Sequence, residues 1–455
     1  MGWGKTGRFG LVILGLSLLF VFGCTISLGM KKHKELKDWG GEPERARFYQ
    51  AGEWKVARAS LHNHTTWSDG CRKPEELLEL ARQQGMAILA ITDHREGTIC
   101  MGKGLCVETG GVENHGYDAY YERLEEIERQ AEEEGMILLE GVEVIPWFYN
   151  MGKFPALVLR GLFQHFTVYG VSDAEVLQNM PIRRNFPDFK PEQIPDATHW
   201  QEFVDYVNEN GGMVHAVHVE SDQDEWLGAA HAVTPSPVRN LHRLRGLTAF
   251  SVLPAAWHQR TGAAGGLWDT VLLEYLTGMR DKPMWSVADA DYHGPHGSLA
   301  IATTLFYMEE FTEKEVYRCM REGRMIALQG ESFQDSYVSE WWVSGSENPA
   351  ERVMLGEEVY IDGTPIVRFA LDHPVDNTTV RLIRNGVVIA EEEGTEITYR
   401  DHELGEKREP AFYRIEVKGP VRKRKKGESY ETRPESELFT NPVFVRFGTE
   451  HLAAR

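Results

Sequence analysis

The sequence predicts an α/β region followed by a smaller β-rich region. From Trp54 to about residue 330, short apolar runs alternate with amphipathic segments, and beyond that point apolar runs follow one another without helical segments between them. Alternation is typical of a parallel sheet covered by helices, whereas consecutive short strands are typical of a β-sandwich. A chain of 455 residues is also longer than one compact domain usually is.

The first region contains the clearest elements. Strands are expected at residues 60–64, 86–92, 136–144, 165–171, 213–219 and 284–288, and helices at 74–84, 117–134, 198–210 and 312–322. The helix at 74–84 is well marked, because Pro74 suits a first turn, Glu75 and Glu76 favour its positive end, and Gly85 suits its end. The length of this region favours a closed or distorted barrel over an open sheet.

The second region, from about 335 to 455, is predicted to be a small β-sandwich. Strands are expected at 367–371, 380–384, 387–390, 412–417 and 443–447. Asn385-Gly386 lies between two of them and is a strong hairpin signal. The basic run at 422–426 is interpreted as a solvated hairpin tip.

The first thirty residues form a separate segment. Lys5 and Arg8 precede an uncharged stretch at 9–30, and Lys31 and Lys32 follow it. The small residue before Cys24 is typical of a bacterial lipoprotein signal, in which Cys24 would be lipidated. An uncleaved membrane anchor and a plain cleaved signal stay open. All three interpretations export the chain to the cell envelope, with 31–57 as a linker to the catalytic region.

Charge and cysteine usage exclude some classes of site. A formal net charge of -20 disfavours nucleic acid as a partner, although bound cations would allow a phosphorylated substrate. The five cysteines include no CxxC pair, so a thiolate zinc site is not expected. Cys100 and Cys106 are close enough in sequence to bridge a loop, but the sequence does not decide their pairing.

A group of metal-binding residue types follows the first two expected strands. His62 and His64 alternate along the first strand, so their side chains point to one side. Asp69 lies in the loop directly after it, and Asp93-His94 ends the next strand. Reacting groups converge at strand C-termini in a parallel barrel. Imidazole and carboxylate together suit zinc, manganese or iron.

Further candidates lie at or near other expected strand ends. They are Glu143, His165, His218, Asp291 and His293. With the first four, His62, His64, Asp69 and His94, they make nine ligands, too many for one ion and suited to about three.

These residues resemble the motifs of the PHP (polymerase and histidinol phosphatase) family. The segments that carry the resemblance are His62-Asn-His64-Thr-Thr-Trp-Ser-Asp69-Gly70, Ile-Thr-Asp-His94, Gly-Val-Glu143, His165, Gly-Gly ahead of His218, and Asp291-Tyr-His293. They occur in the family's order and span residues 58–330. The resemblance implies a distorted (β/α)7 barrel with a trinuclear site.

The resemblance also implies how the ligands are shared. His62, His64, Glu143 and Asp291 would hold one metal. Glu143 would bridge to a second metal, held also by His165 and His218, and Asp69, His94 and His293 would hold a third.

The sequence departs from the family pattern at two places. Val219 replaces the usual proline after His218, which leaves His215 as an alternative ligand. Asp289 competes with Asp291, although the Asp-x-His spacing favours Asp291. Long insertions at 97–116 and 220–268 are expected to shape the substrate pocket.

The expected function is hydrolysis of phosphate mono- or diesters in a small phosphorylated substrate. Divalent metals would supply hydroxide and neutralise the phosphoryl oxygens. Asp69 is expected to be a catalytic residue as well as a ligand. His218 or His293 would protonate the leaving oxygen. Arg95 could contact phosphate or form a salt bridge. Two alternatives stay open, namely a metal-dependent hydrolase of another bond, such as an amide or lactone, and a non-catalytic metal-binding surface protein.

Overall fold

The computed structural model describes residues 26–27, 47–100, 106–152, 158–185, 197–220, 223–227, 230–234, 241–253, 261–294, 298–420 and 435–448. The predicted lipidation site Cys24 lies outside these ranges, as does the basic run at 422–426. Within the described ranges, no helix is both long enough and apolar enough to cross a membrane.

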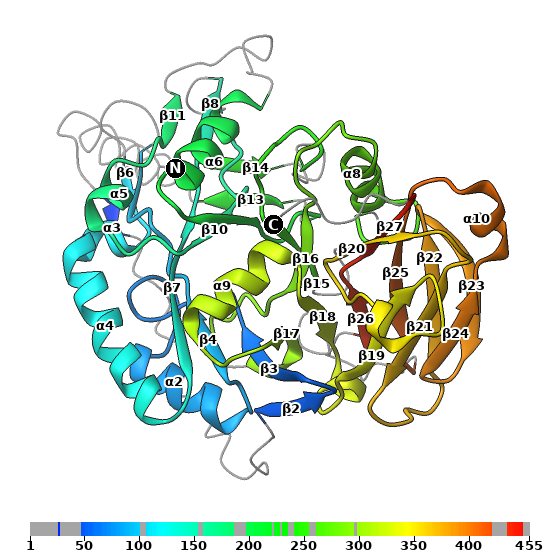
Figure 1. The fold of residues 1–455 in the computed structure, drawn as a ribbon. Helices are drawn as coiled ribbons and strands as arrows, with labels where there is room; N and C mark the ends of the chain where they lie inside the picture. Colours follow the sequence, from blue (N-terminus) through cyan, green and yellow to red (C-terminus); the bar gives the residue numbers. More distant parts are fainter. Residues whose placement is uncertain are drawn as a thin grey trace, which may run out of the picture.

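A row of seven strands forms the centre of the first region, and the mixed α/β class is confirmed (Figure 1). Their order is β16-β15-β12-β10-β7-β4-β3. The bounds are β3 (Trp54–Ser60), β4 (Ile88–Ile91), β7 (Ile137–Val144), β10 (Phe166–Tyr169), β12 (Met213–Ala216), β15 (Ala249–Leu253) and β16 (Trp285–Ala288). Their residues are almost entirely buried, as expected for strands covered on both faces.

The expectation of a wholly parallel sheet is wrong for β10. This strand runs antiparallel to both of its neighbours, β7 and β12. The predicted first strand also ends earlier than expected, at Ser60, so His62 and His64 lie on the extended segment after β3. Hydrophobic patterning identifies a buried strand but does not give its direction, which explains the first error.

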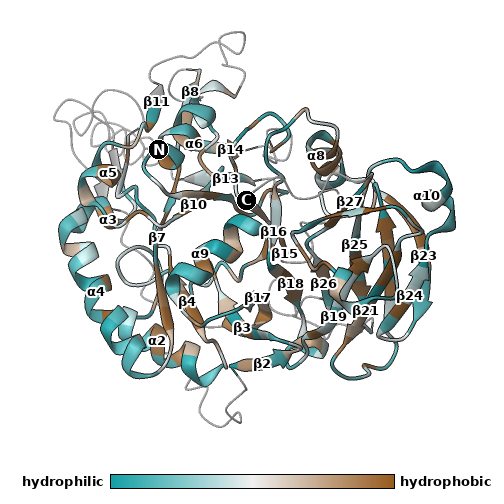
Figure 2. Ribbon diagram, in the orientation of Figure 1, coloured by the Kyte–Doolittle hydropathy of each residue, from teal (hydrophilic) through white to brown (hydrophobic). Residues whose placement is uncertain are grey.

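Amphipathic helices cover the outside of the row. The first-region helices are α2 (Pro74–Gln83), α3 (Val112–His115), α4 (Tyr117–Glu133), α5 (Ala174–Gln178), α6 (Thr198–Glu209), α8 (Leu267–Leu276) and α9 (Glu313–Glu322). α2 begins as predicted, with Pro74 in its first turn and the Glu76 carboxylate accepting from the Lys73 N–H at 3.0 Å. Figure 2 shows brown strands inside and largely teal helices such as α4 outside.

The predicted insertion at 220–268 is more than a pocket-shaping loop, because it supplies β15 to the central row. Two further strands of this insertion and three strands between residues 147 and 185 form a separate five-stranded sheet, β11-β8-β9-β14-β13. Its strands are β8 (Trp147–Met151), β9 (Val158–Arg160), β11 (Arg183–Asn185), β13 (Gln223–Leu227) and β14 (Ala230–Thr234). The insertion at 97–116 contains β5 (Thr98–Cys100) and β6 (Cys106–Glu108), whose register places Cys100 opposite Cys106.

The C-terminal strands continue the central sheet. β3 pairs with β2 (Phe48–Ala51) and β17 (Ala302–Met308), β17 pairs with β18 (Met325–Gln329), and β18 pairs with β26 (Glu437–Thr440). The sheet then runs through β25 (Ala411–Lys418) to β22 (Thr379–Arg384) and β23 (Val387–Glu393), with β27 (Val443–Phe447) and β20 (Glu358–Ile361) beside it. The domain boundary near residue 330 therefore stays a prediction.

A second sheet lies against these C-terminal strands (Figure 1). It contains β19 (Val338–Ser344), β21 (Ile366–Leu371) and β24 (Glu396–Arg400), and α10 (His402–Lys407) follows β24. The predicted hairpin is confirmed, since Asn385 and Gly386 both have positive φ, 50° and 83°, between β22 and β23.

Candidate metal centre

All nine predicted ligands lie around one edge of the central row. His62 and His64 follow β3, His94 follows β4, Glu143 is the penultimate residue of β7, His218 follows β12, and Asp291 and His293 follow β16. Asp69 lies in the loop after His64.

His165 reaches the same edge because β10 is reversed. It directly precedes β10, whose first residue, Phe166, lies opposite Val144 at the end of β7 and Ala216 at the end of β12. In a parallel strand the first residue would lie at the far edge of the sheet. The direction that the sequence did not predict is therefore what allows His165 to join the site.

Backbone hydrogen bonds hold these strand ends together. The His64 N–H donates to the Tyr292 carbonyl at 2.9 Å, and the Tyr292 N–H donates to the His62 carbonyl at 3.1 Å. The Glu143 N–H donates to the Asp93 carbonyl at 3.0 Å. The segments that follow β16 and β3, the two ends of the row, are thus hydrogen-bonded to each other at the site. These bonds hold Asp291 and His293 beside His62 and His64.

Glu143 lies at the centre of the group and is almost fully buried. Its Oε1 is 2.9 Å from His165 Nδ1, 3.1 Å from His218 Nε2 and 3.2 Å from His62 Nε2. Its Oε2 is 2.9 Å from His94 Nδ1 and 3.3 Å from His64 Nε2. The two carboxylate oxygens face different sets of imidazoles, which is the arrangement of a bridging ligand.

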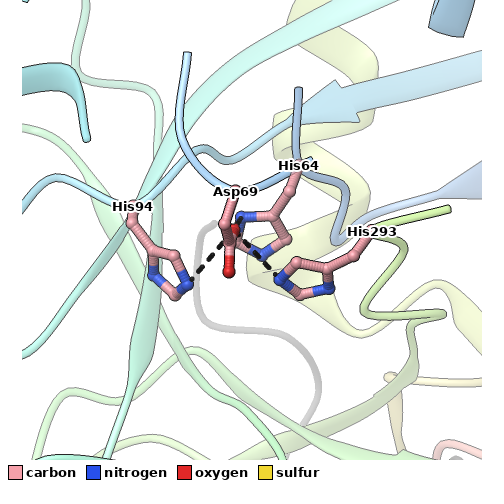
Figure 3. A group of neighbouring side chains, drawn as sticks. All are labelled: His64, Asp69, His94 and His293. Atoms are coloured by element: carbon pink, nitrogen blue, oxygen red, sulfur yellow. Dashed lines mark ion pairs between the residues drawn. The ribbon is translucent and has the colours of Figure 1, made fainter. Parts of the chain in front are cut away.

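Asp69 is the centre of a second group with three imidazoles (Figure 3). Its Oδ1 lies 3.2 Å from His293 Nε2 and 3.6 Å from both His94 Nε2 and His64 Nδ1. Because His94 and His64 also contact Glu143, the two groups share ligands.

Asp291 completes the set on the β16 side. Its Oδ1 is 3.4 Å from His62 Nε2 and 3.5 Å from His64 Nε2, which are themselves 3.1 Å apart. Asp291 and His218 have φ of 45° and 32°, a left-handed backbone that L-residues rarely adopt. Such conformations cost about 1–2 kcal/mol each and concentrate at functional sites.

Neighbouring groups orient three of the imidazoles toward the centre. His165 Nε2 lies 3.1 Å from the Leu162 carbonyl, and His293 Nδ1 lies 3.0 Å from the Asp291 carbonyl. His62 Nδ1 faces Asp289 Oδ1 at 3.5 Å. An outer partner on one ring nitrogen, with the other nitrogen directed inward, is typical of metal-bound histidine.

The donor atoms fit divalent cations. Ligands of one tetrahedral ion at about 2.1 Å lie about 3.4 Å apart, and the separations here run from 2.9 to 3.6 Å. Asp69 Oδ1 and Glu143 Oε2 are buried and accept no hydrogen bond from any described group, although imidazole nitrogens lie close. Carboxylate oxygens that are buried among imidazole nitrogens without a completed hydrogen bond suit a metal site.

The imidazoles and carboxylates compensate one another's charge in the metal-free chain. Burial opposes the charged rings of His62 and His94, but Glu143 and the nearby aspartates outweigh it and hold both pKa values well above the ordinary value. Burial also lowers the pKa of His293, but Asp291 and Asp69 raise it to about 9. Burial would raise the pKa of Glu143, but the surrounding imidazoles hold it well below its usual range.

Asp93 supports the site, although sequence reasoning assigned it no role. It is fully buried, and it accepts from the Thr65 N–H at 2.7 Å, the Thr65 hydroxyl at 2.7 Å and the Ser68 hydroxyl at 2.6 Å. It thereby fixes the loop between His64 and Asp69. The sequence feature that could have predicted this role is the position of Asp93 directly before His94, at the end of a buried strand.

Gly70 allows the same loop to close tightly. A Cβ at this position would lie 2.2 Å from the His64 carbonyl oxygen, so a larger residue requires the backbone to move. The Gly70 N–H donates to the Thr65 carbonyl at 3.0 Å, which ends the turn that carries Asp69.

The remaining candidates take other positions. His215 lies in the core beside Tyr169, its pKa lowered to about 3 by burial, and it joins none of the metal-ligating groups. Asp289 contacts the outer nitrogen of His62 and the Ser251 hydroxyl. Arg95 donates to the Leu177 carbonyl from two guanidinium nitrogens, at 2.9 and 3.0 Å, and lies near Glu96, so its guanidinium is already engaged.

Comparison with known proteins gives one family match. The model of the PHP domain family matches residues 60–155. No curated protein matches the sequence. The matched segment contains five of the nine candidate ligands, His62, His64, Asp69, His94 and Glu143.

Three solved structures are similar at low identity. A two-domain protein containing a predicted PHP-like metal-dependent phosphoesterase from Bacteroides vulgatus is 11% identical over 89% of this chain and 99% of its own, with a TM-score of 0.39. A candidate metal-dependent phosphoesterase from Bifidobacterium adolescentis is 15% identical over 52% and 88%, with a TM-score of 0.27. An amidohydrolase from Chromobacterium violaceum, with bound sulfate and no metal, is 17% identical over 52% and 88%, with a TM-score of 0.26.

Replacing Asp93 is expected to weaken metal binding. In Asp93→Ala the buried Thr65 and Ser68 donors lose their acceptor, so the loop that carries Asp69 loosens. Loss of such an outer partner costs about 10- to 100-fold in metal affinity. Titration with Mn²⁺ would measure the loss, with Asp93→Asn as the control that keeps one acceptor. Unchanged affinity in Asp93→Ala would contradict this role.

Metal binding is expected to release protons and to tighten as pH rises. The rings of His62, His94 and His293 have raised pKa values, so they are protonated near neutral pH and a cation must displace those protons. Calorimetry in two buffers of different ionisation enthalpy would count the protons released at pH 7. A binding enthalpy that is the same in both buffers would refute proton release.

Proposed function

From the PHP domain that residues 60–155 match, we propose that this protein is a metal-dependent hydrolase that cleaves phosphate mono- or diesters. The observation that carries the proposal is Glu143, buried among five imidazoles, with its two oxygens facing different sets of them. A bridging carboxylate among nitrogen ligands is suited to more than one transition metal.

We propose a trinuclear site of zinc, manganese or iron. Three overlapping groups of donors support it: His64, Asp69, His94 and His293; His62, His64 and Glu143; and His94, Glu143 and His165. His218 adds a nitrogen to the third group, and Asp291 adds an oxygen to the second. The proposed distribution of ligands among the metals differs from the sequence-based assignment in one respect. His64 and His94 each contact both Asp69 and Glu143, so neither belongs to a single group.

The finer fold is also a proposal, a distorted barrel with a C-terminal β-sandwich. The hydrogen bonds between Tyr292 and the His62 and His64 backbone support the barrel, because they link the two ends of the seven-strand row. The apolar core between the β19-β21-β24 sheet and the strands β22, β25 and β27 supports the sandwich.

The reaction would take place on the side of Asp69, Asp291 and His293. Their side chains are 38%, 27% and 33% exposed, whereas those of His62 and His64 are fully buried. Bound divalent ions would neutralise the phosphoryl oxygens and lower the pKa of water. In a state in which it does not hold a metal, His293, the most exposed imidazole among the nine candidate ligands, would donate a proton to the leaving oxygen, and His218 beside Glu143 is the second candidate.

Hydrolysis of aryl phosphate mono- and diesters by the Mn²⁺- or Zn²⁺-loaded chain tests the proposal. His62→Ala, Glu143→Gln and Asp291→Ala are each expected to lower the rate by about 100-fold or more, because removing a direct ligand costs more than removing an outer partner. His199→Ala is the control, since the partly buried His199 contacts Glu202 and is not one of the nine candidate ligands.

The outcomes separate the alternatives. If His62→Ala and Asp291→Ala hydrolyse these esters as fast as the wild-type protein, the assignment is wrong. Cleavage of amides or lactones without phosphate esters would give a hydrolase of another class. Metal binding without turnover across the panel would favour a non-catalytic role.

The N-terminal segment supports a proposal for the cellular location. We propose that the chain is exported to the cell envelope and attached to the membrane through lipid on Cys24, and that its substrate is a small phosphorylated molecule. Mass spectrometry of the mature N-terminus is expected to find acylated Cys24. An intact N-terminus would indicate the uncleaved anchor, and an unmodified cleaved one would indicate a plain signal.

A further inference from the structure

The strand β16 supports much of the candidate metal centre. The segment that follows it carries Asp289, Asp291 and His293. One edge of β16 pairs with β15 through a backbone ladder. Along its other edge, the part of the chain that the structure describes places no strand in a ladder with β16. Two side chains bond this edge instead.

Thr304, on β17, bonds one position of this edge. Its hydroxyl accepts from the Ala288 N–H at 2.9 Å and donates to the Ala288 carbonyl at 2.8 Å. One hydroxyl thus satisfies both backbone groups of the last residue of β16, directly before Asp289.

Asn441 bonds the alternate position. Its Oδ1 accepts from the Ser286 N–H at 2.8 Å, and its Nδ2 donates to the Ser286 carbonyl at 3.1 Å and to the Met325 carbonyl of β18 at 2.9 Å. Backbone groups of residues two apart on a strand point to the same edge. The carboxamide therefore takes the place of a backbone peptide between β16 and β18.

The C-terminal strands hold Asn441 firmly. It is fully buried and directly follows β26, which pairs with β18. The indole N–H of the buried Trp341 donates to its carbonyl at 3.2 Å. The amide that bonds β16 is thus positioned by two elements of the C-terminal region.

We propose that Asn441 is a positioning residue of the metal centre, through which the C-terminal strands fix β16 and so hold Asp291 and His293 in place. This inference rests on the proposed function, because it takes the nine side chains to bind metals. It assigns the C-terminal region a part in building the centre. Without the amide, the Ser286 N–H and carbonyl are left buried and unsatisfied, so β16 shifts to find other partners.

Mn²⁺ binding to the full chain, followed by the EPR signal of the free ion, tests the inference. Asn441→Leu keeps the side-chain volume and removes all four side-chain hydrogen bonds to β16 and β18, including the one from the Ser286 hydroxyl. Its affinity for the ions nearest Asp291 and His293 is expected to fall by about 10- to 100-fold, as for loss of an outer partner. Should this variant not fold, Asn441→Ser, whose shorter side chain does not span to β16, takes its place.

Two further variants separate positioning from general loss of stability. Ile397→Ala removes apolar volume from the C-terminal core on β24, away from β16, and is expected to bind Mn²⁺ like the wild type. Thr304→Val removes the other bond to the β16 edge and is expected to weaken binding. Because both act through β16, the double variant Thr304→Val, Asn441→Leu should lose less affinity than the product of the single losses.

The outcomes distinguish the two proposals. Wild-type protein that binds no Mn²⁺ or Zn²⁺ would overturn the proposed metal-dependent function. The role of Asn441 would be overturned if Asn441→Leu bound Mn²⁺ as tightly as the wild type, or if Ile397→Ala lost as much Mn²⁺ affinity as Asn441→Leu. Either result would leave the proposed function standing.

Discussion

The buried carboxylate of Glu143 is the interaction on which the arrangement of the site depends. Five imidazoles lie within 3.3 Å of its two oxygens, and these side chains come from segments next to β3, β4, β10 and β12. A buried charge without compensation is costly. The surrounding imidazoles, and the cations that they are suited to bind, therefore determine where each strand end must lie.

The backbone meets this requirement at some conformational cost. His218 and Asp291 adopt positive φ, and Gly70 permits a loop that a Cβ would block. Asp93 holds that loop with three hydrogen bonds, and Asp289 lies behind His62. Asp93 and Asp289 are almost fully buried, so side-chain positions at the centre are set from several directions.

Side chains replace a backbone ladder at the outer edge of β16. Thr304 and Asn441 bond alternate residues of that edge, and Asn441 belongs to the C-terminal strands. The buried ion pair between Arg414 on β25 and Asp269 on α8 is a second such link, with nitrogen–oxygen distances of 2.6 and 2.7 Å. The two regions are thus joined by polar contacts as well as by the continuous sheet.

The element types and the residue types of the site could be predicted from the amino-acid sequence. Alternating apolar runs and Pro74 predicted β4, β7 and α2 to within a few residues, because local patterning reflects burial and capping. Ligand-type residues at strand ends identified all nine side chains that the structure gathers. The substitution of Val219 for proline did not remove His218 from the group.

How these side chains meet depends on the folded chain. The reversal of β10, the place of β15 in the central row and the contacts of Asp93 and Asn441 all depend on pairings between segments far apart in the chain. A strand's hydrophobic pattern is the same in either direction, and a buried Asn or Asp shows its partner only once the chain has folded. The set of candidate ligands was therefore predictable from the sequence, and the geometry of the site depends on the fold.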